Sequence, residues 1–120
     1  MDPGRTLGRL KRSEEFRRVY QSGVRRAGTL VVVHAFPNGL GMVRLGVSVG
    51  RRFGRATARN RVKRRLREAV RWHRPRMRTG VDVVVVPRTA AGTAAYRELR
   101  DEVRATLEAT GVLTGGRQEA

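Results

Sequence analysis

The stretch Arg51–Arg71, RRFGRATARNRVKRRLREAVR, gathers a large share of the chain's positive charge into one segment with a helical pattern. On a helical wheel, with about 100° per residue, the small and apolar residues of this segment share an arc of about 80° with one histidine. These residues are Ala58, Val62, Leu66, Ala69 and His73. The pattern predicts a helix whose narrow apolar stripe is buried against the rest of the domain.

The arc beside this stripe is basic over about the next 140° of the wheel. It contains, in angular order, Arg59, Lys63, Arg67, Asn60, Arg71 and Arg64. Like charges four residues apart destabilise a helix by roughly a few tenths of a kcal/mol per pair, so a bound polyanion is the simplest compensation. A solvated arginine-rich surface is the alternative interpretation, but the density of this basic face favours a nucleic-acid-binding surface.

The composition of the whole chain agrees with that interpretation. A length of 120 residues fits one domain, and a net charge of +17 is typical of proteins that bind nucleic acid or an anionic membrane. A membrane is the weaker choice because no apolar run approaches about 18 residues. The first 12 residues lack the apolar core of a secretory signal, and the chain has no cysteine. Both features lead us to expect a protein of the reducing cytoplasm.

The two ends of the chain lack a regular hydrophobic pattern. Residues 1–12 contain glycine, proline and four basic residues, and we expect a flexible basic arm there. Residues 114–120 are predicted to be a disordered tail. A single domain is therefore expected over residues 1–113, with the arm as its first part.

Two further helices and three strands are expected between these ends. The helices are Glu14–Gln21, with Ser13 as N-cap, and Ala94–Thr110, with Thr93 as N-cap. The strands Thr29–Phe36 and Val43–Val49 flank a Pro-Asn-Gly turn and predict a hairpin. The strand Val81–Val86 is almost continuously apolar, so we place it in the middle of the sheet with both faces buried.

A candidate ligand-binding surface lies on the first helix and the second strand of this hairpin. Phe16 and Tyr20 are four residues apart and share one helix face, beside two arginines. Such rings are either core residues or platforms on which the bases of a single strand stack, and the spacing alone leaves both roles open. Gly46 and Ser48 point to the same face of their strand and leave room for a ligand close to the backbone.

No catalytic residue and no metal site are expected in this chain. The segment from Gly46 to Gly50 matches the G-x-S-x-G pattern of hydrolases, but Ser48 would lie within a strand and no histidine follows His73. His34 and His73 fit structural positions on a strand and on the buried helical stripe, and no pair of residues has metal-ligand spacing.

The central stretch, R-R-F-G-R-A-x-x-R-N-R-x-K-R-x-x-R, closely resembles the signature of the bacterial ribonuclease P protein subunit. The likeness extends from about Leu10 to Leu107, and the aromatic pair on the first helix matches the family as well. It implies an α+β fold, an αβββαβα α/β sandwich similar to the second domain of a ribosomal protein. It also implies a four-stranded, mostly antiparallel sheet with a left-handed βαβ crossover, and a short strand near Val24–Ala27.

The activity implied by this resemblance is endonucleolytic removal of the 5′ leader from precursor tRNA by a ribonucleoprotein. The RNA subunit would perform the hydrolysis with Mg²⁺, and the protein would assist as an accessory subunit, 1:1 with the RNA. Membrane and DNA are not expected as partners. An RNA-binding protein or RNA chaperone of the ribosomal-protein type, with a purely structural role, is the alternative.

The resemblance also divides the candidate residues into two sites. The leader of precursor tRNA would contact Phe16, Tyr20, Ser48 and Arg51. The catalytic RNA would contact Arg52, Arg55, Arg59, Asn60, Arg61, Lys63, Arg64 and Arg67. Binding a leader that mature tRNA lacks would favour substrate over product.

Overall fold

The structure is a computed structural model that describes residues 7–114. Its strands are β1 (Leu7–Arg9), β2 (Val24–Ala27), β3 (Val31–Pro37), β4 (Val43–Val47) and β5 (Val81–Pro87). Its α-helices are α1 (Ser13–Ser22), α2 (Ala56–Trp72) and α3 (Tyr96–Ala109). Short 3₁₀ turns precede α2, β5 and α3 at Arg51–Phe53, Arg74–Arg76 and Thr89–Gly92.

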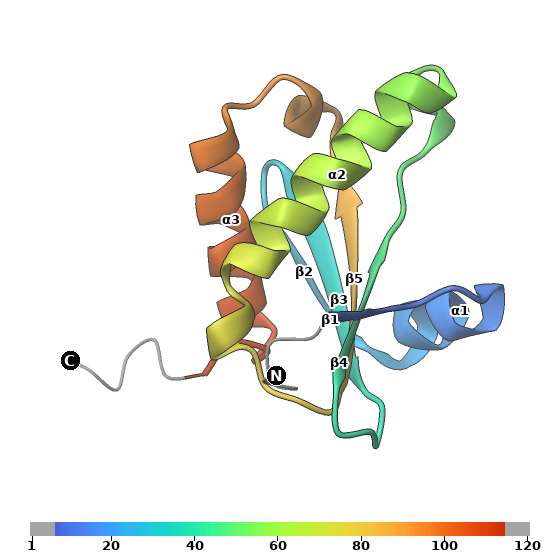
Figure 1. Cartoon of the computed structure of the whole chain (residues 1–120), viewed down its shortest axis with the longest axis vertical. Helices are drawn as coiled ribbons and strands as arrows, with labels where there is room; N and C mark the ends of the chain where they lie inside the picture. Colours follow the sequence, from blue (N-terminus) through green and yellow to red (C-terminus); the bar gives the residue numbers. More distant parts are fainter. Residues whose placement is uncertain (1–6, 115–120) are drawn as a thin grey trace.

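The strands form one mixed sheet in the order β1-β4-β5-β3-β2. Helix α1 covers one face, and α2 and α3 cover the other, so that the sheet lies between two helical layers (Figure 1). The expected α+β class and the short strand at Val24–Ala27 are confirmed. The sheet itself differs from the expected four mostly antiparallel strands. It has five strands within residues 7–114, and the β1–β4 and β4–β5 pairs are parallel.

The predicted hairpin between β3 and β4 is wrong, because β5 lies between these two strands. Strand β5 is largely buried on both faces, as is typical of a strand inside a sheet, where each edge pairs with a neighbouring strand. The loop between β3 and β4 is hydrogen-bonded to Gly80, the residue just before β5. The backbone N–H of Asn38 donates to the Gly80 carbonyl at 2.9 Å, and the Gly80 N–H donates to the Met42 carbonyl at 3.0 Å. The prediction of a central β5 is confirmed.

The prediction of a flexible arm is wrong for the last residues of that segment. Leu7–Arg9 forms the edge strand β1, and the Leu10 N–H donates to the Leu45 carbonyl at 3.0 Å. Main-chain pairing along an edge requires no alternation of side chains, so no pattern in the sequence marks it. At the other end, Thr114 donates from its backbone N–H to the Arg76 carbonyl at 2.6 Å. The remaining parts of the predicted arm and tail, residues 1–6 and 115–120, lie outside the described residues.

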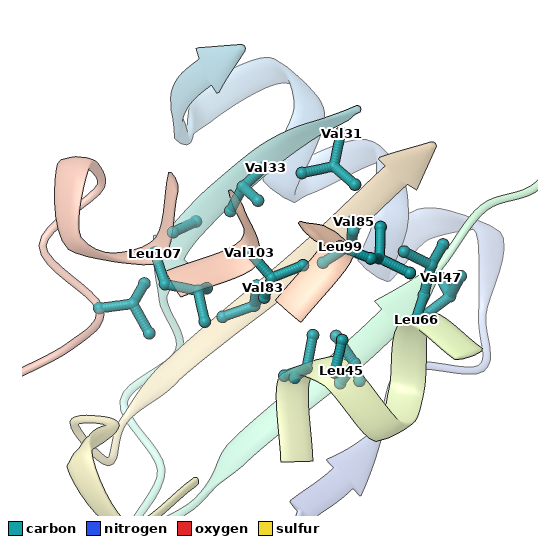
Figure 2. Packing of buried hydrophobic residues seen from close by; sticks show 14 of the residues in the cluster. Val31, Val33, Leu45, Val47, Leu66, Val83, Val85, Leu99, Val103 and Leu107 are labelled. Carbon is teal, nitrogen blue, oxygen red and sulfur yellow. The ribbon is translucent and has the colours of Figure 1, made fainter. Parts of the chain in front are cut away.

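The main core lies between the sheet and the two helices α2 and α3 (Figure 2). Residues of one face of the sheet, such as Leu45 on β4 and Val83 on β5, contact Leu66 of α2 and Leu99 of α3. Four of the five residues of the predicted stripe, Val62, Leu66, Ala69 and His73, are buried, and Ala58 is partly buried. This burial fixes the rotation of α2 about its own axis, so its basic residues must face away from the core.

The two predicted N-caps are displaced by one or two residues. Arg12, not Ser13, is the N-cap of α1, and Ala95, not Thr93, is the N-cap of α3. In α1 the Glu15 carboxylate accepts the Arg12 backbone N–H at 3.0 Å. A glutamate at the third helical position therefore satisfies the first turn without a hydroxyl side chain at the cap.

A network of charges links α1, β4 and β5 on the α1 side of the sheet. Asp82 of β5 is 1% exposed and accepts hydrogen bonds from Nε and Nη2 of Arg44, each at 2.8 Å. Asn38 donates a third bond to Asp82 at 2.8 Å, and Arg44 also contacts Glu15 of α1 at 3.1 Å. The hydrogen bond to Asp82 raises the pKa of Arg44 above its ordinary value, so the guanidinium stays charged. The network therefore links α1 to β4 and β5, the central part of the sheet.

Glu102 of α3 holds the turn between β2 and β3. Its carboxylate accepts hydrogen bonds from the hydroxyl of Thr29 at 2.7 Å and from the N–H of Val31 at 2.8 Å. It also accepts a hydrogen bond from the N–H of Leu30. Burial acts to raise the pKa of Glu102, but these hydrogen bonds outweigh it, and the pKa lies below its ordinary value of 4.5. The carboxylate is therefore the form that stabilises the fold.

We expect Glu102→Gln to lower the free energy of unfolding at pH 7 by about 1 kcal/mol. Because the folded-state pKa is depressed, this stabilisation is present above pH 4.5 and is lost as the pH falls below that value. Urea unfolding from pH 7 to pH 3 would therefore show the gap between parent and variant closing below pH 4.5. Glu108→Gln, at an exposed carboxylate on the same helix, is the control. A gap that stays constant with pH would contradict the assignment.

Candidate nucleic-acid interface

A cleft opens where α1, the end of β4 and α2 meet. Its volume is about 530 Å³. It is lined by Lys11, Ser13, Phe16, Arg17, Tyr20, Val47, Ser48, Val49 and Lys63. The structure thus brings together three of the four residues predicted to bind the leader. The cleft combines aromatic rings, hydroxyl groups and three cations, which are the groups that contact bases, ribose and phosphates of a single strand.

Phe16 belongs to the core and to the cleft at once. Its ring is partly buried and packs against a small cluster of Leu10, Val19 and Val84 under α1. A Cβ atom at Gly46 would lie 2.6 Å from this ring, so only glycine lets the ring rest on β4. The space that Gly46 was predicted to leave for a ligand is therefore filled in part by Phe16.

Tyr20 lines the cleft and is more exposed than Phe16. The residue is 39% exposed, and its ring meets His34 of β3 edge to face at 4.8 Å between centroids. Burial lowers the pKa of His34, and the nearby charge of Arg25 lowers it further, so the imidazole is neutral at pH 7. The His34 imidazole therefore orients the Tyr20 ring but, being neutral, adds no positive charge that would attract a phosphate.

The remaining predicted leader contacts divide. Ser48 follows the end of β4 and lines the cleft, and its backbone N–H donates to the Val85 carbonyl at 3.1 Å. Arg51 is exposed in the 3₁₀ turn before α2 and is not a lining residue of the cleft. Lys63, predicted for the catalytic RNA, lines the cleft instead. Its place on the wheel puts it on the edge of the basic face that adjoins the buried stripe.

A second groove, of about 390 Å³, runs along the basic face of α2. It is lined by Arg9, Asn60, Arg64, Arg67, Glu68 and Arg71. Burial lowers the pKa of Arg67 from its ordinary value, and the like charges of Arg9 and Arg71 lower it further. These guanidinium groups repel one another, so an anion placed between them is strongly favoured. Three predicted RNA contacts, Asn60, Arg64 and Arg67, lie in this groove.

The other residues predicted for RNA lie around the first turns of α2. Arg52, Arg55 and Arg61 are exposed, and Arg59 is partly buried, and none of them lines either hollow. Gly54, just before the helix, has φ of 102°, a value that favours glycine and brings the chain sharply into α2.

Sequence reasoning missed several residues of these two surfaces. Arg71 shares the basic face on the wheel and could have been included on that ground. Arg9 could not, because only the pairing of β1 with β4 carries it to α2. Lys11 and Arg17 extend the cleft beyond the aromatic pair. No helix within residues 7–114 is long and apolar enough to cross a membrane.

Comparison with known proteins bears directly on these surfaces. The family model described as Ribonuclease P matches residues 5–111, which include both the cleft and the groove. The chain belongs to the ribonuclease P protein family. It is therefore a protein component of ribonuclease P, the ribonucleoprotein of tRNA 5′ processing.

Relatives and solved structures of ribonuclease P proteins agree over nearly the whole chain. The ribonuclease P protein component of Symbiobacterium thermophilum is 43% identical over 106 residues, 88% of this chain and 92% of that protein. The component of Caldanaerobacter subterraneus subsp. tengcongensis is 38% identical, over 87% and 90%. Among solved structures, the RNase P protein of Thermotoga maritima has a TM-score of 0.77 at 30% identity, covering 84% and 96%. That of Staphylococcus aureus has a TM-score of 0.79 at 28% identity, covering 88% and 97%.

Proposed function

We propose that this protein holds the 5′ leader of precursor tRNA in the cleft while the basic face of α2 docks on the catalytic RNA. One observation carries the proposal: the two surfaces share a single helix. Lys63 of α2 lines the cleft, and Arg64, the next residue, lines the groove. A strand in the cleft and an RNA in the groove would thus contact adjacent sides of one rigid helix, because successive residues lie about 100° apart around it. The cytoplasm is the compartment in which we place this activity.

The cleft accounts for a preference for substrate over product. Mature tRNA lacks the leader, so contacts made in the cleft are lost when the leader is removed. Stacking on Tyr20 and the charges of Lys11, Arg17 and Lys63 suit any sequence, because every base has an aromatic face and every nucleotide a phosphate. The protein would stabilise the complex of RNA subunit and substrate with little regard to leader sequence.

Hydrolysis itself is assigned to the RNA subunit, with which we propose a 1:1 complex. Ser48 shares the cleft with Lys63, whereas His73 follows the far end of α2, about 15 Å along the helix axis from Lys63. His73 is buried and its Nε2 lies 3.0 Å from the Arg100 carbonyl. His73 is therefore not placed to activate Ser48. The Mg²⁺ of the holoenzyme is likewise proposed to act on the RNA, since residues 7–114 contain no group of three His, Asp or Glu side chains that would hold a metal.

Tyr20→Ala is expected to weaken binding of precursor tRNA to the reconstituted holoenzyme by about 1–3 kcal/mol, or ~5- to 150-fold in Kd. Binding of leaderless tRNA should not change. Tyr20→Phe keeps the ring and should keep most of the affinity. Leu40→Ala removes an equally exposed apolar side chain from the loop before β4 and is the matched control.

Equal loss of affinity for both tRNA forms would contradict leader binding in the cleft. If the parent holoenzyme bound both forms equally, a purely structural RNA-binding role would replace the proposal. Tyr20 is exposed, so the variant should unfold at the same urea concentration as the parent, and this measurement separates loss of binding from loss of folding.

A further inference from the structure

Trp72, the only tryptophan of the chain, is 61% exposed at the end of α2. Tryptophan is usually well buried, and an exposed indole beside cations is typical of a binding surface rather than of a folded core. On the helical wheel Trp72 lies with Arg61 and Arg65, on the side of α2 that faces α3. Arg65 confirms that direction, because its guanidinium donates to the Ala91 carbonyl at 3.2 Å, in the turn that leads to α3.

The position of Trp72 is fixed by contacts between α2 and α3. The next residue, His73, is buried and meets the backbone carbonyl of Arg100 through Nε2 at 3.0 Å. The Arg100 guanidinium lies 4.3 Å from the centre of the Trp72 ring, a cation–π contact that covers part of the indole. The indole is thus held in place while most of its surface faces solvent.

A hollow of about 310 Å³ adjoins this indole. The residues that give it its character are Trp72, Pro75, Arg76, Arg100, Asp101 and Arg104. Three arginines and one aspartate surround one aromatic ring, so the surface offers a flat stacking platform within positive charge. An apolar protein partner would leave these charges buried and unpaired, and a simple anion would make no use of the indole. A nucleotide, with a base and a phosphate, uses both.

This surface is separate from the cleft and from the groove. It shares no lining residue with either of them. Trp72 lies nine residues beyond Lys63, about 14 Å along α2. Arg71 lines the groove, whereas Trp72 beside it turns toward α3, so the two residues lead to different sides of the helix.

We propose that an unpaired RNA base stacks on Trp72, with its neighbouring phosphates against Arg76 and Arg104. This contact goes beyond the proposed function, because it requires neither the tRNA leader nor the groove of α2. Base stacking on an aromatic side chain tolerates any sequence, and purines, with the larger ring system, should bind best.

The fluorescence of Trp72 gives a direct test, since no other tryptophan is present. The full-length chain is titrated with a single-stranded oligoadenylate decamer and, as the matched control, with a decamer of abasic ribose phosphate that has the same charge. We expect the oligoadenylate to quench most of the indole emission in a saturable manner and the abasic decamer to leave it nearly unchanged. Tyr20→Ala should show the same quenching, which separates this site from the cleft.

Binding measured separately should agree with the fluorescence. In the Tyr20→Ala background, Trp72→Ala is expected to weaken oligoadenylate binding ~5-fold or more, and Trp72→Phe to retain most of the affinity. Arg104→Gln should reduce the salt dependence by about one released ion. Circular dichroism and urea unfolding verify that the variants remain folded.

Three outcomes would overturn the inference. Equal quenching by both decamers would mean that charge alone approaches Trp72 without stacking. Emission that stays unchanged with both decamers would mean that RNA does not reach the indole. A spectral shift that depends on protein concentration without RNA would mean that a second copy of the chain covers Trp72.

Discussion

Replacing Arg64, Arg67 and Arg71 together with glutamine should weaken binding of the catalytic RNA roughly 100- to 1,000-fold at about 0.1 M salt. All three line the groove on α2, where Arg9 adds a fourth guanidinium. Each lost phosphate contact also removes about one unit from the slope of log K against log salt concentration, so the slope should fall by about three. Filter binding or fluorescence anisotropy over a salt series measures both quantities.

The same triple variant should be at least as stable as the parent toward urea. Burial and the charges of Arg9 and Arg71 depress the pKa of Arg67, which shows that these groups repel one another in the free protein. Removing the repulsion should stabilise the helix even though the proposed RNA contacts are lost. The matched control replaces three exposed arginines outside the groove, Arg26, Arg88 and Arg97, with glutamine. Equal losses of affinity in the two triple variants would refute the groove as the docking surface, because total charge alone would then explain binding.

Asp82→Asn should lower the free energy of unfolding by about 3–5 kcal/mol. Asp82 is 1% exposed and accepts two hydrogen bonds from Arg44 and one from Asn38. The substitution keeps the volume and creates no cavity, but it leaves the Arg44 guanidinium, 19% exposed, without its main counter-charge. Urea unfolding should show a lower midpoint with an unchanged m-value.

Two further variants test the cause of that loss. Arg44→Met combined with Asp82→Leu should recover at least half of the stability, because a buried ion pair can be replaced by apolar groups once both charges are removed. Glu15→Gln, at the more exposed end of the network, should cost much less than Asp82→Asn. If the free energy of unfolding of Asp82→Asn lay within about 1 kcal/mol of the parent value, the network would not be what links α1 to β5.

Much of the fold follows from local patterns in the sequence. The stripe of Val62, Leu66 and Ala69 predicted which side of α2 is buried, because burial of one face is a property of the helix alone. The almost continuously apolar run of β5 predicted a central strand, because a strand with two apolar faces must be covered on both. Which strands pair with each other does not follow from local patterns. The segments of β3 and β4 met the local criteria for a hairpin, but β5 pairs with both of them and lies between them.

The candidate site was predictable to a similar degree. Phe16, Tyr20 and Ser48 share the cleft, as expected from their spacing and from the family resemblance. A helical wheel gives the direction of a side chain but not which element lies opposite it. Lys63 was therefore predicted to contact the catalytic RNA, although it lines the cleft beside α1. Arg9 was not predicted, because its position in the groove depends on the pairing of β1 with β4, which joins segments more than 30 residues apart. The wheel places Trp72 outside the buried stripe, but it does not show the arginines of α3 that lie beside the indole.

The position of β5 has a consequence for synthesis of the chain. Until the ribosome has made β5, the nascent segment contains α1, β1 to β4 and all of α2, but the strand that joins β3 to β4 is missing. Neither half of the sheet can close without it, since both pair with β5 and not with each other. The arginine-rich helix α2 is therefore made before the sheet that supports it can be completed.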